Sequence, residues 1–317
     1  MKKKIVVLGM GGTIAGKSVN VADNIGYAVA QLHVEDLITS AYGSSVPFEI
    51  EIEQIAQFDS KDMSFSALSV LAQRVMYWLS LDDVRGVVIT YGTDTLEEAA
   101  FFLQQVCSPA KPVVFTCAMR PSTALMPDGP QNLRDAFTVA LDASASGVLV
   151  MCAGRVHTAR DVQKSHTYML DAFTSGDAGC VAYVEEGVLR RAGRWSLSGE
   201  DFVVNALQKI TEMTQRTDAW PSVEIVMNYV GASGRVVDAL VDLGIQGIVV
   251  AGTGNGTIHQ CLESALLRAK EKGVVVVRST RCVNGRVLPL PNSLLPDSAG
   301  LNPVKARIAL ILQLLSA

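Results

Sequence analysis

The feature that most constrains the fold is a regular alternation of short aliphatic runs with helical patterns. Four runs are rich in Val and Ile and are bounded by Gly or Pro, namely Ile5–Gly9, Gly86–Thr90, Pro112–Cys117 and Gly147–Met151. Such runs are typical of strands buried on both faces of a parallel sheet. Helical patterns lie between them, at 95–107, where Thr95 and Glu98 form a candidate capping box, and at 132–143. The alternation predicts an α/β fold with a mostly parallel sheet flanked by helices.

The alternation is interrupted once and then resumes. Residues 193–222 lack a clear period, and strand patterns follow at 223–227, 247–251 and 274–278, with helical patterns at 235–243 and 258–272. A last helix is predicted from Asn302 as N-cap and Pro303 as its first residue. We therefore expect a larger N-terminal domain over 1–195, a linker over 196–222 and a smaller α/β domain over 223–317.

Composition and charge exclude several classes of protein. The 27 Lys and Arg residues against 31 Asp and Glu give a net charge of −4, which does not favour nucleic-acid binding. Apolar runs stay well below the ~18–20 residues of a membrane span. The apolar start after Met1 ends in glycines after four residues, unlike a signal peptide. The six cysteines are scattered without a CxxC pair, so we expect free thiols in a reducing compartment. Because no signal peptide is recognised, we expect a cytoplasmic protein.

Polar side chains follow the predicted strands where ligands usually bind. Thr13 comes after the first strand, Thr93 and Asp94 follow the second, and Asp128 follows the third after the segment 118–127. Because parallel strands end at one edge of a sheet, these groups are expected to share a crevice. A hydroxyl that attacks a carbonyl carbon needs a base, and the resulting oxyanion needs hydrogen-bond donors. The pattern therefore favours nucleophilic chemistry.

Other chemistries fit the sequence less well. The dinucleotide pattern that begins at Gly9 has Ile14 where its third glycine belongs, and the one at Gly252 has Thr257 there. Gly11 and the triplet Gly16–Ser18 match the spacing of a phosphate-binding loop, but no helical pattern follows. The four histidines lack the spacing of metal ligands. We therefore expect no cofactor and no metal.

Several motifs together resemble one known family over nearly the whole chain. They are Gly11–Gly16, Tyr91–Glu98, Ala118–Pro121, Asp128–Pro130, Lys164 and Leu301–Arg307. The chain is similar in these segments to the bacterial L-asparaginases of the homotetrameric type, which include secreted enzymes. The resemblance implies an asparagine amidohydrolase, with L-asparagine as substrate, whose homotetramer is a dimer of dimers with active sites completed at the dimer interface.

The resemblance also implies roles for individual residues. Thr13 would be the nucleophile that forms an acyl-enzyme, and Tyr27 would lie on a mobile loop that closes over the substrate. Thr93, Asp94 and Lys164 would form a second catalytic group beside Thr13. Asp94 and Thr93 would also bind the substrate, with Asp94 on its α-ammonium group and Ser60 on its α-carboxylate.

The chain departs from the family pattern at several positions. Lys61 stands where secreted members usually have glutamine, which would place an ammonium group near the substrate's carboxylate, so Lys61 is a candidate substrate-binding residue. Cys107 has no cysteine with which to form the disulfide of some secreted relatives, and Thr257 replaces a frequent Asn. The segment 282–300 has Asp297 as its one carboxylate, whereas secreted relatives supply a glutamate from this region to a neighbouring subunit. We therefore expect weaker asparagine binding than in those relatives and low glutaminase activity.

Two other functions remain open from the sequence. One is an amino-acid-binding or sensing protein on the asparaginase scaffold, although such a protein would not need two threonines and a lysine in its site. The other is the amidohydrolase subunit of a tRNA amidotransferase, which would carry an extra N-terminal domain.

Overall fold

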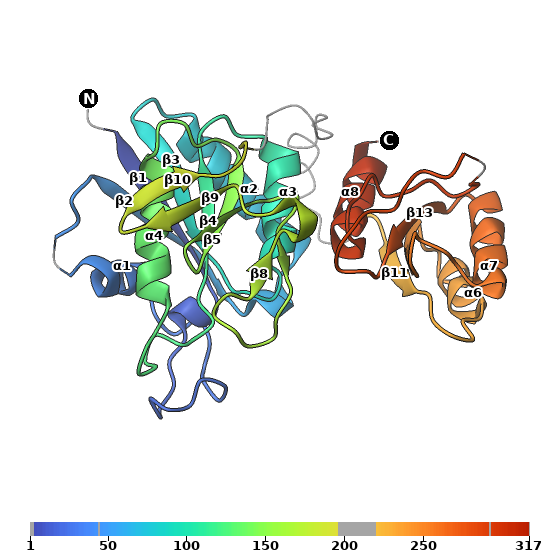
Figure 1. Ribbon diagram of the computed structural model, residues 1–317, viewed down its shortest axis with the longest axis horizontal. Coiled ribbons are helices and arrows are strands. Elements are labelled where there is room, and N and C mark those ends of the chain that lie inside the picture. Colours follow the sequence, from blue (N-terminus) through green and yellow to red (C-terminus); the bar gives the residue numbers. More distant parts are fainter. Residues whose placement is uncertain (1–2, 44, 196–219, 292, 317) are drawn as a thin grey trace. The chain divides into compact units, whose positions relative to one another are not determined.

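The chain folds into two compact units, Met1–Val203 and Val204–Ala317. The computed structural model describes residues 3–43, 45–195, 220–291 and 293–316, and its elements are labelled in Figure 1. Most of the predicted linker, residues 196–219, lies outside the described residues, so the predicted domain bounds stay a prediction. Among the described residues, no helix is long and apolar enough to cross a membrane. All six cysteines are free thiols.

The larger unit is built on an eight-stranded sheet with the order β10-β9-β6-β5-β4-β3-β1-β2. Its strands are β1 (Lys4–Gly11), β2 (Ile50–Phe58), β3 (Val84–Thr90), β4 (Val113–Thr116), β5 (Val148–Cys152), β6 (Arg155–Thr158), β9 (Ala182–Glu185) and β10 (Val188–Arg191). The strands β1 to β5 pair in parallel, whereas β6, β9 and β10 extend the sheet in antiparallel fashion. The predicted mostly parallel sheet is therefore confirmed.

Helices cover both faces of this sheet. α1 (Val34–Tyr42) and α4 (Gly129–Leu141) pack against each other and on one face, and α2 (Phe65–Leu79) and α3 (Leu96–Cys107) lie together on the other. Successive side chains of a strand point to opposite faces. Ile5 and Val7 accordingly join the hydrophobic core under α1 and α4, while Val6 and Leu8 are also fully buried. Burial on both faces explains why the strand sequences are continuously apolar.

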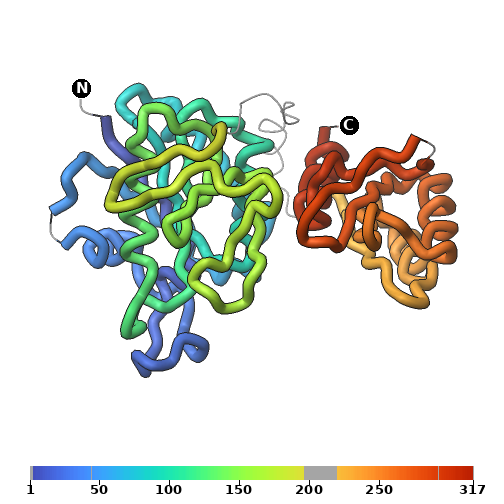
Figure 2. The backbone as a smooth tube through the Cα atoms, in the orientation of Figure 1, coloured from blue at the N-terminus to red at the C-terminus, as the bar shows by residue number. Residues whose placement is uncertain are grey.

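Short elements complete the larger unit around one edge of the sheet. They are the 3-10 turns η1 (Thr13–Ala15), η2 (Ser60–Asp62) and η3 (Gly176–Ala178), and the small hairpin of β7 (Gln163–Lys164) and β8 (Phe173–Thr174). Between η1 and α1 the chain forms a loop that is closed at its base by a bridge between Lys17 and Ala28. Figure 2 shows this blue segment projecting from the body of the unit.

The predicted capping box at the start of α3 is wrong, although the helix itself begins where the pattern placed it. Thr95 is the N-cap, but its side chain makes no capping hydrogen bond. Its hydroxyl instead donates to the backbone oxygen of Ser60 at 2.7 Å. The rotamer that makes this tertiary contact leaves the hydroxyl oxygen without a hydrogen bond from the first turn of its own helix.

The smaller unit has a three-stranded parallel sheet. It consists of β11 (Val223–Met227), β12 (Gly247–Gly252) and β13 (Val275–Thr280), with α6 (Arg235–Asp242), α7 (Gln260–Glu271) and α8 (Pro303–Ser316) around it. α8 packs on all three strands. The predicted cap of α8 is confirmed, because the backbone nitrogen of Lys305 donates to Asn302 Oδ1 at 3.0 Å.

The order of strands places a ligand-binding edge in the larger unit. The chain passes from β1 to β2 on one side and then to β3 on the other side of β1. In open α/β sheets, ligands bind where the strand order reverses in this way, beyond the carboxyl ends of the strands. The turns after β1 and β3 touch at this point: a Cβ at Gly12 would lie 2.4 Å from the backbone of Gly92. Gly12 also has φ 83°, which favours glycine.

We predict that Gly12→Ala destabilises the larger unit because the added methyl group would overlap the backbone of Gly92. Gly43→Ala is the matched control, since Gly43 also has a positive φ but has no atom within 4 Å of an added Cβ. The overlap should make Gly12→Ala about 1–3 kcal/mol more destabilising than Gly43→Ala. Urea unfolding of both variants measures the difference. Equal losses would show that the two turns do not need this contact.

Candidate active site

Thr13 lies in η1, directly after β1. Its side chain is buried, and its Oγ1 is 2.7 Å from the phenolic oxygen of Tyr27. Gly12 makes the turn that brings Thr13 out of the strand. A hydroxyl held against a second hydroxyl in a sheltered position is oriented for chemistry rather than for capping a helix.

Tyr27 comes from the loop between Lys17 and Ala28. Its ring packs on Gly16, where a Cβ would approach Tyr27 Cδ2 to 2.8 Å. Burial is the main cause that raises the pKa of Tyr27; the nearby carboxylates of Asp94 and Asp59 also raise it, and the hydrogen bond to Thr13 opposes them. Tyr27 is therefore a neutral phenol near neutral pH, and it holds Thr13 Oγ1 by a hydrogen bond rather than as a phenolate.

Hydrogen bonds also attach this loop to the segment after β4. Ser122 donates from both its backbone nitrogen and its hydroxyl to the backbone oxygen of Gly16, at 2.9 and 2.7 Å. Thr123 Oγ1 accepts from the nitrogen of Ser18 at 2.8 Å. Asp128 shapes the same segment, because its carboxylate accepts from the backbone nitrogens of Met119 and Arg120, both at 2.9 Å.

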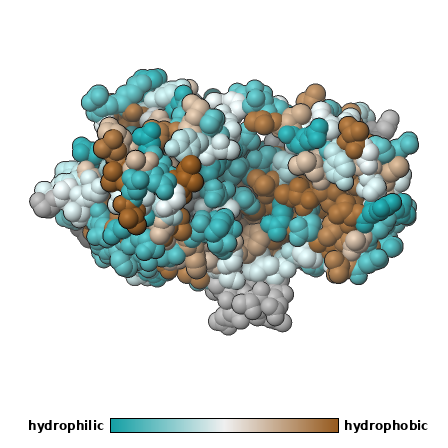
Figure 3. Space-filling model, turned by 90° about the horizontal axis from the view of Figure 1, so that it is seen from below, coloured by the Kyte–Doolittle hydropathy of each residue, from teal (hydrophilic) through white to brown (hydrophobic). Residues whose placement is uncertain are grey.

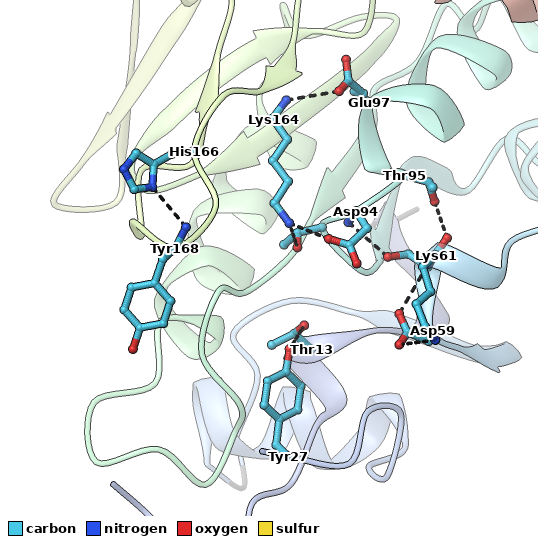
Figure 4. Close-up of polar contacts among 12 residues, drawn as sticks. Thr13, Tyr27, Asp59, Lys61, Asp94, Thr95, Glu97, Lys164, His166 and Tyr168 are labelled. Atoms are coloured by element: carbon cyan, nitrogen blue, oxygen red, sulfur yellow. Dashed lines mark hydrogen bonds and ion pairs between the residues drawn. The ribbon is translucent and has the colours of Figure 1, made fainter. Parts of the chain in front are cut away.

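Thr93, Asp94 and Lys164 form a second polar group at the end of β3. Lys164 Nζ lies 2.8 Å from Thr93 Oγ1 and 2.6 Å from Asp94 Oδ1 (Figure 4). Lys164 reaches this position from β7, and its backbone nitrogen donates to Glu97 Oε1 at 3.3 Å. The sequence resemblance had named these three residues together, and the fold brings them into direct contact from 70 residues apart.

Ser60 links the end of β2 to the same group. The residue is 3% exposed, and its Oγ accepts from the backbone nitrogen of Asp94 at 3.1 Å. Its carbonyl oxygen accepts from Thr95, as described above. Gly92 permits this approach, because a Cβ there would lie 2.4 Å from Ser60 Oγ.

These groups surround one open pocket of about 380 Å³. It is lined by Thr13, Asn24, Ile25, Tyr27, Val29, Asp59, Ser60, Thr93, Asp94, Met119, Lys164, Thr167 and Tyr168. Six of the seven residues expected from the sequence therefore meet in it, namely Thr13, Tyr27, Ser60, Thr93, Asp94 and Lys164. The pocket combines hydroxyls, carboxylates and one ammonium group, which suits a small zwitterionic ligand.

Lys61 is the expected residue that the structure does not bring to the pocket. Its ammonium group lies 2.9 Å from Asp59 Oδ2 and 2.7 Å from Asp62 Oδ2, and its side chain is 59% exposed. The ammonium group is thus paired with Asp59, which lines the pocket, and with Asp62, which does not, while Lys61 itself is not among the lining residues. The expected contact of Lys61 with the substrate's carboxylate therefore has no support in this geometry.

Sequence reasoning missed several lining residues. Asp59 adjoins Ser60 and is a carboxylate, so its position beside an expected binding residue was a usable signal. Met119 lies in the motif Ala118–Pro121, which was also a usable signal, whereas Tyr168 offered none, because its place depends on the β7–β8 hairpin. Among the described residues, no cluster of His, Cys, Asp and Glu is arranged to hold a metal ion.

Comparisons with known proteins identify the family. Residues 4–197 match the family model described as Asparaginase, N-terminal, and residues 222–316 match the Glutaminase/Asparaginase C-terminal domain. L-asparaginase 2 of Bacillus subtilis (strain 168) is 37% identical, over 98% of this chain and 82% of that protein. Glutaminase-asparaginase of Pseudomonas fluorescens biotype A is 34% identical, over 96% and 84%.

A solved structure extends the likeness to the fold. The crystal structure of a probable cytoplasmic L-asparaginase from Campylobacter jejuni aligns with a TM-score of 0.88 and 35% identity, covering all of this chain and 96% of that one. Both family models and relatives matched over nearly the whole chain point to one family. The chain belongs to the bacterial asparaginase family.

Proposed function

We propose that this protein is an L-asparagine amidohydrolase, which converts asparagine to aspartate and ammonia through an acyl-enzyme on Thr13. The observation that carries the proposal is the meeting, in one pocket, of the Thr13–Tyr27 pair and the Thr93–Lys164–Asp94 group. An amino-acid-binding or sensing protein would need the Asp94 carboxylate and Ser60, but it would not need the hydroxyls of Thr13 and Thr93 or the ammonium group of Lys164.

In the first half of the reaction, Thr13 Oγ1 attacks the side-chain carboxamide carbon. An ester bond forms as the carbon–nitrogen bond breaks, and the nitrogen takes up the proton lost by Thr13 and leaves as ammonia. Tyr27 orients Thr13 Oγ1 through the 2.7 Å hydrogen bond. Holding the reacting oxygen in place removes much of the entropic cost of the attack.

In the second half, water attacks the ester and frees Thr13. Lys164 donates to Thr93 Oγ1, and its positive charge lowers the cost of removing the Thr93 proton. Thr93 is thereby suited to pass a proton to and from the attacking water. Asp94 keeps Lys164 in place through the 2.6 Å ion pair.

The same residues bind the two charged ends of the substrate. Asp94 is half exposed toward the pocket and accepts the α-ammonium group with the oxygen that Lys164 does not occupy. Ser60 receives the α-carboxylate. Its position is fixed by the hydrogen bonds to the Asp94–Thr95 turn, so both ends of the substrate are recognised by one rigid unit.

The first prediction concerns ammonia release from L-asparagine. The wild-type protein should release ammonia, and Thr13→Ala should lower kcat by about a thousandfold or more, because deleting a nucleophile removes a bond formed in the reaction. Thr39→Ala, which removes an exposed hydroxyl on α1, is the control and should keep full activity. Circular dichroism checks that both variants fold.

Two results would contradict this assignment. A Thr13→Ala variant that keeps more than about a tenth of kcat would show that Thr13 is not the nucleophile. A wild-type protein that binds L-aspartate but releases no ammonia from L-asparagine, L-glutamine or D-asparagine would be a binding protein on this scaffold.

A second prediction concerns glutamine. We expect low glutaminase activity, because the extra methylene group of glutamine displaces the carboxamide from Thr13 and few anchors compensate.

Asp297 is the one acid of the segment 282–300, and its Oδ1 accepts from the backbone nitrogen of Ala299 at 2.8 Å. Asp297→Asn should therefore leave kcat/KM for asparagine within about threefold of the wild type. A loss of tenfold or more would show that Asp297 reaches a neighbouring site.

A third prediction concerns assembly as a homotetramer formed from two dimers. Hydrophobic side chains gather in a broad area on the visible face of the smaller unit (Figure 3). Exposed apolar residues of this unit include Val230, Leu243 and Leu294, at 102%, 84% and 66%. Surfaces of this kind mark association sites. Sedimentation velocity should give a mass near four chains, and a fully active monomer would refute the assembly.

A further inference from the structure

A second lysine–carboxylate pair lies at the pocket besides Lys164 and Asp94. Asp59 lines the pocket, and Lys61 Nζ contacts Asp59 Oδ2 at 2.9 Å from outside it. Figure 4 shows both pairs with the Thr13–Tyr27 contact. The side chain of Asp59 is 25% exposed, against 52% for Asp94, so Asp59 is the more sheltered of the two carboxylates.

The backbone fixes Asp59 relative to Asp94. Asp59 is the N-cap of η2, and its Oδ1 also accepts from the backbone nitrogen of Lys61 at 3.4 Å. The next residue, Ser60, is bonded to the turn of Asp94 and Thr95. Both carboxylates lie close enough to Tyr27 to act on its hydroxyl electrostatically. Asp59 and Asp94 are thus both tied to Ser60, and both line the pocket that Thr13 lines.

Lys61 balances the negative charge of Asp59 and holds its side chain in one orientation. Its hydrogen bonds to Asp62 and Asp59 raise the pKa of Lys61, so that it stays protonated at all physiological pH values. Its charge offsets the repulsion between Asp59 and Asp62, and between Asp59 and a substrate carboxylate at Ser60. Lys61 also restricts the rotation of the Asp59 side chain, because it binds Oδ2 while the backbone holds Oδ1.

The substrate's α-ammonium group needs more acceptors than Asp94 offers. An ammonium group has three donors, and one oxygen of Asp94 is already bonded to Lys164. We propose that Asp59 is a second anchor for the α-ammonium group of the substrate and that Lys61 is the positioning residue that holds the Asp59 carboxylate in place. This role rests on the proposed function for its substrate and assigns the anchor to the same chain that carries Thr13.

The test compares ligands with and without the α-ammonium group. Asp59→Asn should weaken the binding of L-aspartate, measured by calorimetry, by about tenfold to a hundredfold, the usual value of a charge-assisted hydrogen bond. Binding of succinate, which lacks the amino group, should change by less than about threefold. In turnover, KM for L-asparagine should rise similarly while kcat falls far less, because the contact is present before and during the reaction.

Two further variants separate positioning from general damage. Lys61→Gln should weaken L-aspartate binding in the same direction but less, by about three- to tenfold, because Asp59 keeps its charge and loses its orientation. Asp83→Asn is the matched control: Asp83 pairs with Lys4 at 3.3 Å in the same unit and does not line the pocket. It should leave both ligands bound as in the wild type.

The proposal is overturned if Asp59→Asn leaves L-aspartate binding unchanged, or if it weakens L-aspartate and succinate equally, which would indicate a distorted pocket. A different result would contradict the proposed function as an asparaginase. In that case the wild type releases no ammonia, and the comparison of L-aspartate with succinate still decides the role of Asp59. A wild type that binds neither ligand would refute both proposals.

Discussion

The close contact of three turns at the carboxyl edge of the sheet is the constraint on which the site depends. Gly12 and Gly92 allow the chain after β1 to touch the chain after β3, and Gly92 also admits the side chain of Ser60 after β2. Strands of a parallel sheet lie ~4.8 Å apart, so the groups that follow neighbouring strands can share one small ligand only if their turns have no bulky atoms between them. The glycines therefore set the distances among Thr13, Thr93 and Ser60 before any substrate binds.

Charge is balanced pair by pair around this contact. Lys164 neutralises Asp94 and Lys61 neutralises Asp59, so the pocket attracts neither a plain anion nor a plain cation strongly. A zwitterion gains from both signs of charge at once. Lys164 has the additional role of joining Asp94 to Thr93, which couples recognition of the substrate to the group proposed for proton transfer.

The sequence predicted the buried parts of the fold well, because residues buried on both faces give continuous apolar runs. The edge strand β2 was missed for the same physical reason: its residues are half exposed and alternate with Glu and Gln, so the run is broken. α1 and α2 were also not assigned from the sequence. Thr95 shows the limit of local patterns, since its hydroxyl bonds a residue 35 positions away in place of its own helix.

For the candidate site, too, the sequence predicted the position of most residues but not of all. Thr13, Thr93, Asp94, Lys164, Ser60 and Tyr27 were named from motifs, and they line one pocket. Lys61 was expected at the substrate because it stands where secreted members of the family usually have glutamine, but it is paired with Asp59 and Asp62, which lie on the same turn. Which carboxylate a lysine pairs with depends on the distances in the folded chain, and the order of residues in the sequence does not give those distances.

The attachment of the Tyr27 loop has a consequence for how this protein would lose activity through proteolysis. Its segment 17–28 is largely exposed, including Val19, Val21 and Ile25, and hydrogen bonds with the segment 122–125 hold it at Gly16, Ser18 and Val21. Exposed loops of this kind are where proteases cut first. A single cut there would release Tyr27 from Thr13 and leave the eight-stranded sheet intact. Such a nicked molecule would keep its melting behaviour and its mass under native conditions, and its loss of reactivity would be invisible to any measurement of folding.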